Sequence, residues 1–231
     1  MLKKISSLER MLLVSVSFTM LLLFTRFAYT KELAYCFYIW NTFLAVLPLL
    51  FSRFLIRLNR FNLRAILLLG CWLAFFPNAP YMITDLFHYT EKPPVPKWFD
   101  LLLVTSAAWN GLLLGIISLM QIEQFLARYL KERWVKITVM ISFMLCGYGV
   151  YIGRYLRFNS WDAVTEPQKL LYTFSLHIFR PQEHVMTWAF TFLFGTMFGI
   201  AYFTLKQLSA GTTRPGSLRP PGAVNIPFPR G

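Results

Sequence analysis

The sequence contains few charged residues, and acidic residues are the scarcer class. Charged side chains make up 14% of the chain, with 10 Asp and Glu against 23 Lys and Arg, whereas soluble domains carry about 25% charged residues. Apolar residues make up 56% of the chain and aromatic residues 18%. So little charge cannot cover a water-exposed surface, which excludes an ordinary soluble domain and indicates a protein surrounded largely by lipid.

Cysteine is also scarce. Cys36, Cys71 and Cys146 each lie inside an apolar run. An odd number of cysteines in such runs gives no disulfide framework, and their spacing matches no metal-binding knuckle. We therefore expect all three to behave as small hydrophobic side chains.

The net charge of +13 raises the question of nucleic-acid binding. The Lys and Arg residues cluster at the ends of apolar runs, however, and this is the pattern of membrane topology signals. We expect the lipid bilayer as a partner and no nucleic acid, and the sequence identifies no protein partner.

Six apolar runs can cross a bilayer as helices, which takes roughly 17–25 residues. The first run is shorter and lies between Arg10 and Arg26, whose long side chains we expect to extend to the lipid headgroups. No small-x-small cleavage site follows it, so we interpret it as an uncleaved membrane helix. The runs are 11–25, 33–52, 65–84, 101–122, 137–153 and 185–205.

The distribution of basic residues predicts the orientation. With the N-terminus inside, the inner segments 1–10, 53–64, 123–136 and the C-terminal end hold 15 of the 23 basic residues and only three of the ten acids. The positive-inside rule therefore places both termini in the cytoplasm. All three histidines and the other seven acids then lie on the outer side.

The predicted fold class is all-α, a polytopic membrane protein with a bundle of six transmembrane helices. We expect a broken third helix and, in the connection before the sixth, a short interfacial helix over 170–179, which is too short to span. We assign 1–208 to the membrane domain. Residues 209–231 are rich in Pro, Gly and Arg, and we expect a disordered tail, native or appended.

The stretch FFPNAPYMITDLFHY (75–89) interrupts the third run. Pro77 cannot continue the backbone hydrogen bonding of a helix, so we expect a kink or an end near Phe76. Asn78 can cap a new helical segment, with Pro80 tolerated in its first turn. At about 100° per residue, four polar residues of this segment fall within about 80° of one another. This stripe consists of Asn78, Tyr81, Asp85 and His88.

The stripe has two interpretations. Asp85 and His88 are candidate catalytic or metal-binding residues, because a carboxylate near an imidazole can share a metal ion or orient a general base. Two ligands are too few for a metal site, so we predict none unless His177 or His184 folds back within reach. Alternatively, the segment is a helix end that enters water, where Asp, His and Tyr are common.

The stretch YIGRYLRFNSWD (151–162) ends the fifth run on the predicted outer side. Arg154 and Arg157 are expected on one helical face, followed by Asn159 and Asp162. Two guanidinium groups suit a phosphate, such as a lipid headgroup or another small anion. Alternatively, the arginines pair with Asp85 or Asp162 and join the outer ends of helices three and five. A third interpretation is anchoring among headgroups within an aromatic belt.

Three weaker signals indicate packing. The glycines of GYGVYIG (147–153) lie inside a membrane helix with no strand before them, so they do not form a dinucleotide loop. The glycines of GTMFG (195–199) allow a neighbouring helix to approach closely. Asn110 is alone in an apolar helix, and we expect it to form an interhelical hydrogen bond.

FFPNAPYMITDLFHY and YIGRYLRFNSWD resemble the signature segments of a family of bacterial multi-pass membrane proteins catalogued as domain of unknown function 1361. The resemblance covers roughly residues 8–207. It implies a location in the bacterial cytoplasmic membrane, and it implies no reaction. The matching motif positions are Pro77, Asn78, Pro80, Tyr81, Asp85, Arg154, Arg157, Asn159, Trp161 and Asp162.

Three functions stay open. The first is an outward-facing polar pocket that binds a small anion or a lipid headgroup. The second is an enzyme that acts on a lipid-linked or cell-envelope substrate with Asp85 and His88. The third is a transporter or accessory subunit, although no internal repeat suggests inverted halves. The sequence indicates no particular cofactor. The candidate ligand-binding residues are Asn78, Tyr81, Asp85, His88, Arg154, Arg157, Asn159 and Asp162.

Overall fold

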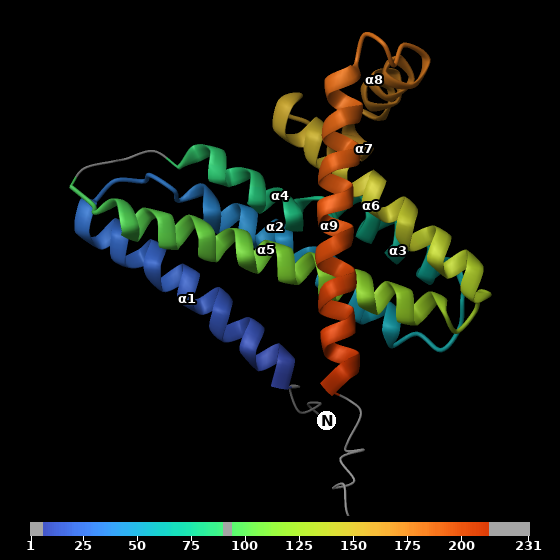
Figure 1. Cartoon of the computed structure of the whole chain (residues 1–231), viewed down its shortest axis with the longest axis horizontal. Coiled ribbons are helices and arrows are strands. Elements are labelled where there is room, and N and C mark those ends of the chain that lie inside the picture. The colour runs from blue at the N-terminus through green and yellow to red at the C-terminus, as the bar shows by residue number, and fades with distance from the viewer. Residues whose placement is uncertain (1–6, 90–93, 213–231) are drawn as a thin grey trace, which may run out of the picture.

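The computed structural model describes residues 7–89 and 94–212, and among these not the side chains of His88, Ala163, Val164 and 210–212. Every regular element in these two ranges is a helix (Figure 1). Six spans are long and apolar enough to cross a membrane, which confirms the predicted fold class. The elements are α1 (Ser7–Thr30), α2 (Phe37–Ile56), α3 (Leu63–Phe75), α4 (Asn78–Thr84), the 3-10 helix η1 (Asp85–His88), α5 (Lys97–Leu126), α6 (Glu132–Tyr155), α7 (Asp162–Thr165), α8 (Pro167–Phe179) and α9 (Val185–Thr212).

The helix α5 is the centre of the bundle. It is the most extensively buried of the six spans, and α1, α2 and α4 all pack along it. The helix α9 packs mainly on α6 and crosses α5 steeply, as Figure 1 shows. Because α5 contacts helices on several sides, its apolar residues are distributed around the whole helix rather than along one stripe.

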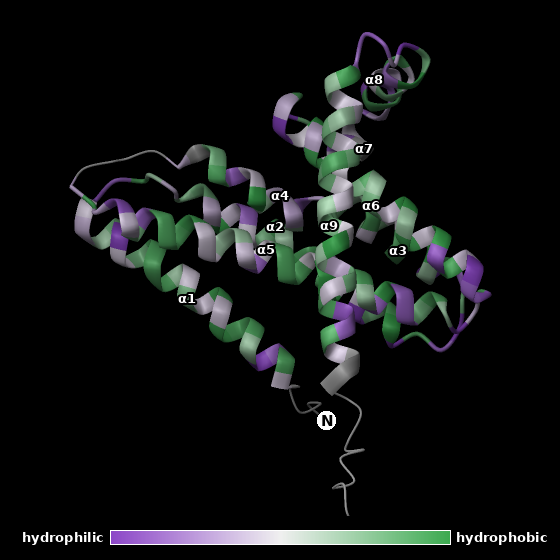
Figure 2. Ribbon diagram, in the orientation of Figure 1, coloured by the Kyte–Doolittle hydropathy of each residue, from purple (hydrophilic) through white to green (hydrophobic). Residues whose placement is uncertain are grey.

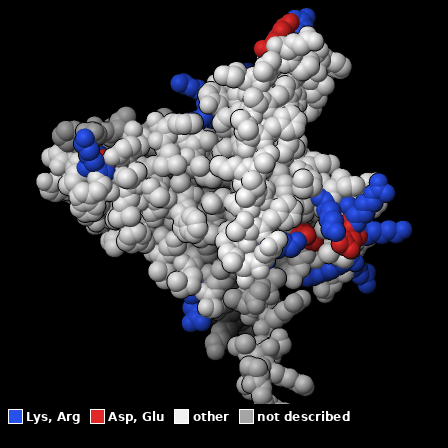
Figure 3. Space-filling view, viewed as in Figure 1, with Lys and Arg blue, Asp and Glu red and all other residues white. Residues whose placement is uncertain are grey.

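The outer surface of the bundle is apolar. Figure 2 shows hydrophobic residues along most of the helices. In the view of Figure 3 the charged side chains lie mainly near the ends of the bundle, with a broad uncharged surface between them. Many large apolar side chains are exposed, among them Phe24, Leu67 and Leu193. Such a surface is stable in hydrocarbon, where exposed apolar groups meet lipid instead of water.

The basic segments predicted to be cytoplasmic lie at one end of the bundle. Arg53 of α2 pairs with Glu9 of α1 (Nη2–Oε1, 2.9 Å). Arg128, just after α5, donates a hydrogen bond to the last backbone carbonyl of α2 (2.9 Å). Lys206 of α9 pairs with Glu123 of α5 (Nζ–Oε2, 2.5 Å). The structure therefore places the described parts of these four segments on a common side, as the topology prediction requires.

The third span is broken at Pro77, as predicted. The helix α3 ends at Phe75 and α4 begins at Asn78, while Pro77 itself keeps helical dihedral angles (φ −61°, ψ −24°). The prediction that Asn78 caps α4 is wrong, because no side chain caps this helix. Asn78 Nδ2 instead donates a hydrogen bond to the backbone oxygen of Phe75 (3.0 Å). In a continuous helix the amide of Ala79 would donate to this oxygen, but here it donates to the backbone oxygen of Phe76.

Glycines bring α6 and α9 into close contact. A Cβ atom at Gly147 would overlap the backbone oxygen of Thr191 on α9. On α9, a Cβ atom at Gly195 would lie 2.8 Å from the backbone oxygen of Phe143. Real Cβ atoms do not approach so closely, so only glycine allows this helix spacing. The packing roles predicted for these glycines are confirmed.

Polar side chains join α1 to α5. Arg26 pairs with Asp100 (Nε–Oδ1, 2.7 Å) and both side chains are buried, so the predicted extension of Arg26 to the headgroups is wrong. Asn110 accepts a hydrogen bond from Ser15 Oγ (2.6 Å) and donates one to Thr19 Oγ1 (2.7 Å), which confirms its predicted interhelical role. Within hydrocarbon these groups can satisfy only one another.

Two short helices, α7 and α8, fill the connection before α9. The helix α8 contains the predicted stretch 170–179 and is too short to span a membrane. It projects from the bundle near the N-terminal end of α9 (Figure 1). The helix α9 continues to Thr212, so the first residues assigned to the tail are helical. Residues 213–231 lie outside the described residues.

Candidate functional site

Asp85 and Arg154 form a buried ion pair between the end of α4 and the end of α6. Arg154 Nη1 lies 3.2 Å from Asp85 Oδ1, and the side chain of Asp85 is 1% exposed. Asn41 of α2 donates a hydrogen bond to the other carboxylate oxygen (Nδ2–Oδ2, 2.9 Å). Three spans therefore meet at one carboxylate, and both of its oxygens are engaged.

The other contacts of Arg154 also lie within the protein. Nη1 donates to the hydroxyl of Tyr81 (3.2 Å), and Nη2 donates to the backbone oxygen of Thr84 (2.8 Å). The guanidinium carbon lies 5.6 Å from the centroid of the Tyr81 ring. Of the alternatives considered for Arg154, pairing with Asp85 is the one that the structure contains. A charge that is already paired is poorly available to an external anion.

A pocket of about 400 Å³ lies next to this ion pair. Asn41 and Tyr81 contribute to both, since they bond to the pair and also line the pocket. The walls come from α2, α3, α4, α6, the segment 158–160 and α8. The pocket therefore joins the two sequence stretches that hold the candidate residues.

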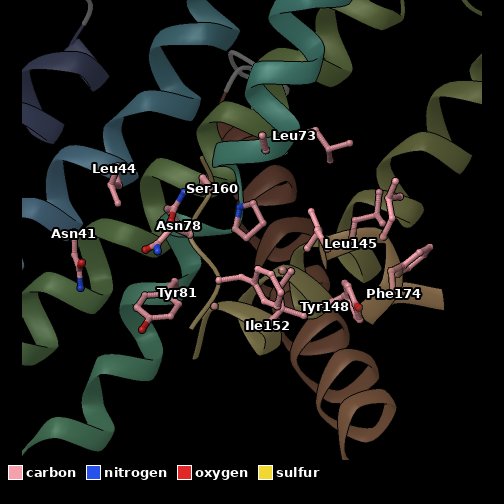
Figure 4. A pocket seen from close by; sticks show the side chains of 18 of the residues that line it. Asn41, Leu44, Leu73, Asn78, Tyr81, Leu145, Tyr148, Ile152, Ser160 and Phe174 are labelled. Carbon is pink, nitrogen blue, oxygen red and sulfur yellow. Dashed lines mark hydrogen bonds between the residues drawn. The ribbon is translucent and has the colours of Figure 1, made fainter. Parts of the chain in front are cut away.

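Most polar lining residues gather on one side of the pocket, while Tyr148 lies on the other side, where its hydroxyl is bonded to His177. Figure 4 shows Asn78, Tyr81 and Ser160 close together, with Leu145 and Phe174 on the opposite side. Asn78 Nδ2 donates a hydrogen bond to Ser160 Oγ (2.6 Å). No Lys, Arg, Asp or Glu is among the described residues that line the pocket. The pocket thus combines an uncharged hydrogen-bonding end with hydrocarbon walls.

Two glycines of α6 contribute to the wall that faces the kink. A Cβ atom at Gly149 would overlap the ring of Pro77, and one at Gly153 would lie 3.6 Å from the ring of Tyr81. Both glycines line the pocket. Side chains at these positions would occupy the space between α6 and α4.

The structure brings most of the predicted ligand-binding residues into one region. Asn78, Tyr81 and Asn159 line the pocket, and Asp85 and Arg154 form the adjoining ion pair. Residues far apart in sequence meet here because the kink in the third span and the end of α6 pack against each other. Their binding role stays a prediction.

Two further candidates lie apart from this cluster. The helix α6 ends at Tyr155, and Arg157 follows with a left-handed backbone (φ 58°) and an exposed side chain. The expectation that Arg157 shares a helical face with Arg154 is therefore wrong, because the helix ends between them. Asp162 accepts a hydrogen bond from the backbone amide of Asn159 (2.7 Å) and so stabilises the turn before α7.

The histidines His177 and His184 form a cluster with Tyr148. The two imidazole centroids lie 4.4 Å apart, and His177 Nδ1 lies 3.0 Å from the hydroxyl of Tyr148. Burial lowers the pKa of His177 below its usual value, and the neighbouring His184 lowers it further. The third candidate histidine, His88, has its side chain outside the described part of the structure. The side chains that are described include no group of three His, Cys, Asp and Glu that could hold a metal ion.

Sequence reasoning missed the contributions of α2 and α8 to the site. A signal for Asn41 existed, because a lone carboxamide in an apolar run is costly in lipid and therefore indicates an interior contact. No comparable signal marked Tyr148 or Phe174, since aromatic residues near a membrane interface are common for other reasons.

The match to a known family covers this whole region. The model of the family described as "Protein of unknown function (DUF1361)" matches residues 40–200. The chain belongs to this family. The match confirms the resemblance in the two motif stretches, and every pocket residue of this DUF1361 protein lies within the matched range. No curated protein and no solved structure matches the chain.

Proposed function

We propose that this DUF1361 protein binds one amphipathic lipid in the pocket between α2, α3, α6 and α8. The observation that carries the proposal is the division of the pocket into a hydrogen-bonding end and apolar walls (Figure 4). A polar headgroup with an attached hydrocarbon chain has the same division. Ligand pockets are typically apolar, with a few polar groups that orient the ligand.

The headgroup binds through carboxamides and hydroxyls in this proposal. Asn78 holds Ser160 through its Nδ2, and Asn159 and Tyr81 lie on the same lining. Since the described lining holds no charged side chain and Arg154 is paired with Asp85, these contacts support a headgroup rich in hydroxyl or amide groups over a small free anion.

The hydrocarbon chain lies along the walls formed by α3, α6 and α8. Leu73, Leu145, Ile152, Leu171 and Phe174 provide the apolar surface. A volume of about 400 Å³ is at the lower end of the range for small-molecule sites, roughly 300–1,000 Å³. We therefore expect the pocket to hold the headgroup region and part of the chain, with the remainder extending into the bilayer.

The pocket faces the outer half of a bacterial cytoplasmic membrane in this proposal, with both termini in the cytoplasm. The support is the gathering of the basic segments at one end of the bundle, through contacts such as Arg128 to α2 and Lys206 to Glu123. The pocket lies toward the other end, near the start of α2 and the end of α6. The positive-inside rule assigns the basic end to the cytoplasm.

Native mass spectrometry of the detergent-purified protein tests lipid binding. We expect wild-type protein to retain one lipid, and Leu73→Trp to lose most of it because the indole fills the pocket. Leu67→Trp is the matched control, because Leu67 lies on the same helix, is 60% exposed and does not line the pocket. Equal lipid retention in all three proteins would contradict the proposal. Release of inorganic phosphate or another small anion alone would favour the free-anion alternative.

A further inference from the structure

The helix α8 forms one wall of the pocket, yet it is weakly attached to the rest of the protein. Leu171 and Phe174 line the pocket. Of the 13 residues of α8, His177 is the only one that is buried. Elements with few buried contacts open at a low free-energy cost. This wall differs from the walls formed by α2, α3 and α6, because those helices belong to membrane spans.

The attachment of α8 is concentrated at His177. Its Nδ1 lies 3.0 Å from the hydroxyl of Tyr148 on α6. Its backbone oxygen, in the last turn of α8, accepts a hydrogen bond from Trp188 Nε1 on α9 (2.9 Å). One residue therefore connects α8 to both of the long helices behind it.

The contact between His177 and Tyr148 shares a residue with the pocket. Tyr148 lines the pocket, and its ring contacts Phe174 of α8 with the two centroids 5.4 Å apart. Movement of α8 away from α6 would thus break the bond to His177 and remove Phe174 from the pocket in one step.

Both ends of α8 have backbone conformations suited to hinges. Glu166, before the helix, has φ −132° and ψ 51°, and Arg180, after it, has φ −127° and ψ 57°. Neither residue is helical, so α8 is not continuous with α7 or α9. Hinges of this kind are a few residues at the ends of an element, and they absorb the change in dihedral angles.

We infer that α8 is a hinged lid over the pocket, that His177 is its latch on Tyr148, and that opening the lid gives a lipid of the outer leaflet access to the pocket. The inference rests on the proposed function for the identity of the ligand. The motion itself depends only on the contacts of α8. Substrate-gating lids in other proteins open on a timescale of microseconds to milliseconds.

Pulsed electron spin resonance on protein in nanodiscs tests the lid. Spin labels replace Lys169 on α8 and Met140 on α6, both exposed, in a variant with Cys36, Cys71 and Cys146 replaced by alanine. Tyr148→Phe removes the latch hydroxyl and keeps the ring. Since such a hydrogen bond contributes about a twofold to twelvefold change in an equilibrium constant, we expect the population with a displaced α8 to rise by a factor in this range. Tyr172→Phe is the control, because Tyr172 is 65% exposed on the same helix and is not part of the latch.

Identical distance distributions in the wild type, Tyr148→Phe and Tyr172→Phe would overturn the lid. Hydrogen exchange of the wild type provides a second test that needs no variant. We expect the amides of 168–179 to exchange together and faster than those of α6 and α9, and equal protection would also overturn the lid. If α8 opens but the protein retains no lipid, the lid is upheld and the proposed lipid binding is rejected. Failure of the lid and failure of the proposed function are therefore distinguishable.

Discussion

Arg26 of α1 and Asp100 of α5 form a two-point ion pair that is almost completely enclosed by the protein. The Nε–Oδ1 distance is 2.7 Å and the Nη2–Oδ2 distance is 3.2 Å, and the two side chains are 1% and 2% exposed. The guanidinium carbon also lies 4.8 Å from the centroid of the Tyr35 ring. Each charge is therefore compensated mainly by the other. The pair holds the C-terminal end of α1 to the first turn of α5.

Removing one partner of this pair should destabilise the protein strongly. Arg26→Gln leaves the carboxylate of Asp100 buried without its counter-charge, and such a change costs about 3–5 kcal/mol. The double variant Arg26→Gln/Asp100→Asn should lose less than Arg26→Gln alone, because no unpaired charge is left. Thermal unfolding of the purified protein in detergent measures both effects.

The control for this experiment is the exposed ion pair between Lys136 and Glu132 on α6, whose side chains are 70% and 81% exposed. Lys136→Gln should leave the unfolding temperature unchanged, because solvent already screens these charges. If Arg26→Gln were as mild as Lys136→Gln, the enclosure of the Arg26–Asp100 pair would be contradicted.

The close contact between α6 and α9 predicts that Gly147→Ala is destabilising. The added methyl group would overlap the backbone oxygen of Thr191, so the two helices must separate, at a cost of about 1–3 kcal/mol. Gly70→Ala is the matched control, because no atom beyond the adjoining turns of its own helix lies within 4 Å of a Cβ there. That substitution should be neutral or stabilising by about 0.5–1 kcal/mol, since alanine favours the helix. Unfolding temperatures in detergent that fall equally for both variants would show that the α6–α9 contact is not the cause.

The spans and the kink could be predicted because each depends on a local property of the chain. Hydrocarbon requires every backbone group to be bonded internally, so a long apolar run has helix as its only spanning solution. Proline has no amide hydrogen, so Pro77 interrupts the hydrogen bonding of a helix whatever surrounds it. The stripe of Asn78, Tyr81 and Asp85 could be predicted from helical spacing alone, and these residues do lie along the site.

The errors concern helix ends and contacts between segments that are distant in sequence. An arginine at the end of a membrane helix is long enough to reach the headgroups or to turn inward, and only the position of Asp100 decides between these for Arg26. Likewise, spacing alone cannot show that α6 ends between Arg154 and Arg157. Asn41 completes the site from another span, and no local pattern specifies which helix faces which.

The stability of the protein should fall in mildly acidic conditions because of His177. Burial, and then the neighbouring His184, lower the pKa of His177 in the folded protein. The folded state therefore binds fewer protons than the unfolded state, whose histidine titrates near pH 6.5. This contribution to stability is complete above about pH 6.5 and is lost as the pH falls below that value.

His177→Gln tests this pH dependence, because glutamine can still hydrogen-bond to Tyr148 but does not titrate. The drop in unfolding temperature between pH 7.5 and pH 5.0 should be smaller in His177→Gln than in the wild type. His184→Gln should give an intermediate drop, because it removes only the smaller of the two causes. Equal drops in the wild type and His177→Gln would contradict the assignment to this residue.

The orientation of the bundle can be tested by labelling single cysteines in intact cells, on a background without Cys36, Cys71 and Cys146. Asn159 and Asn59 are both exposed, and they lie on opposite sides of the proposed topology. A membrane-impermeant maleimide should react with Asn159→Cys in intact cells and with Asn59→Cys only after permeabilisation. The reverse result would turn the pocket toward the cytoplasm, so that its lipid comes from the inner leaflet, while the contacts of the pocket stay the same. Three spans lie between these two positions: α3 with α4, α5, and α6. Reaction of both cysteines in intact cells would place them on the same side and so contradict this odd number of membrane crossings.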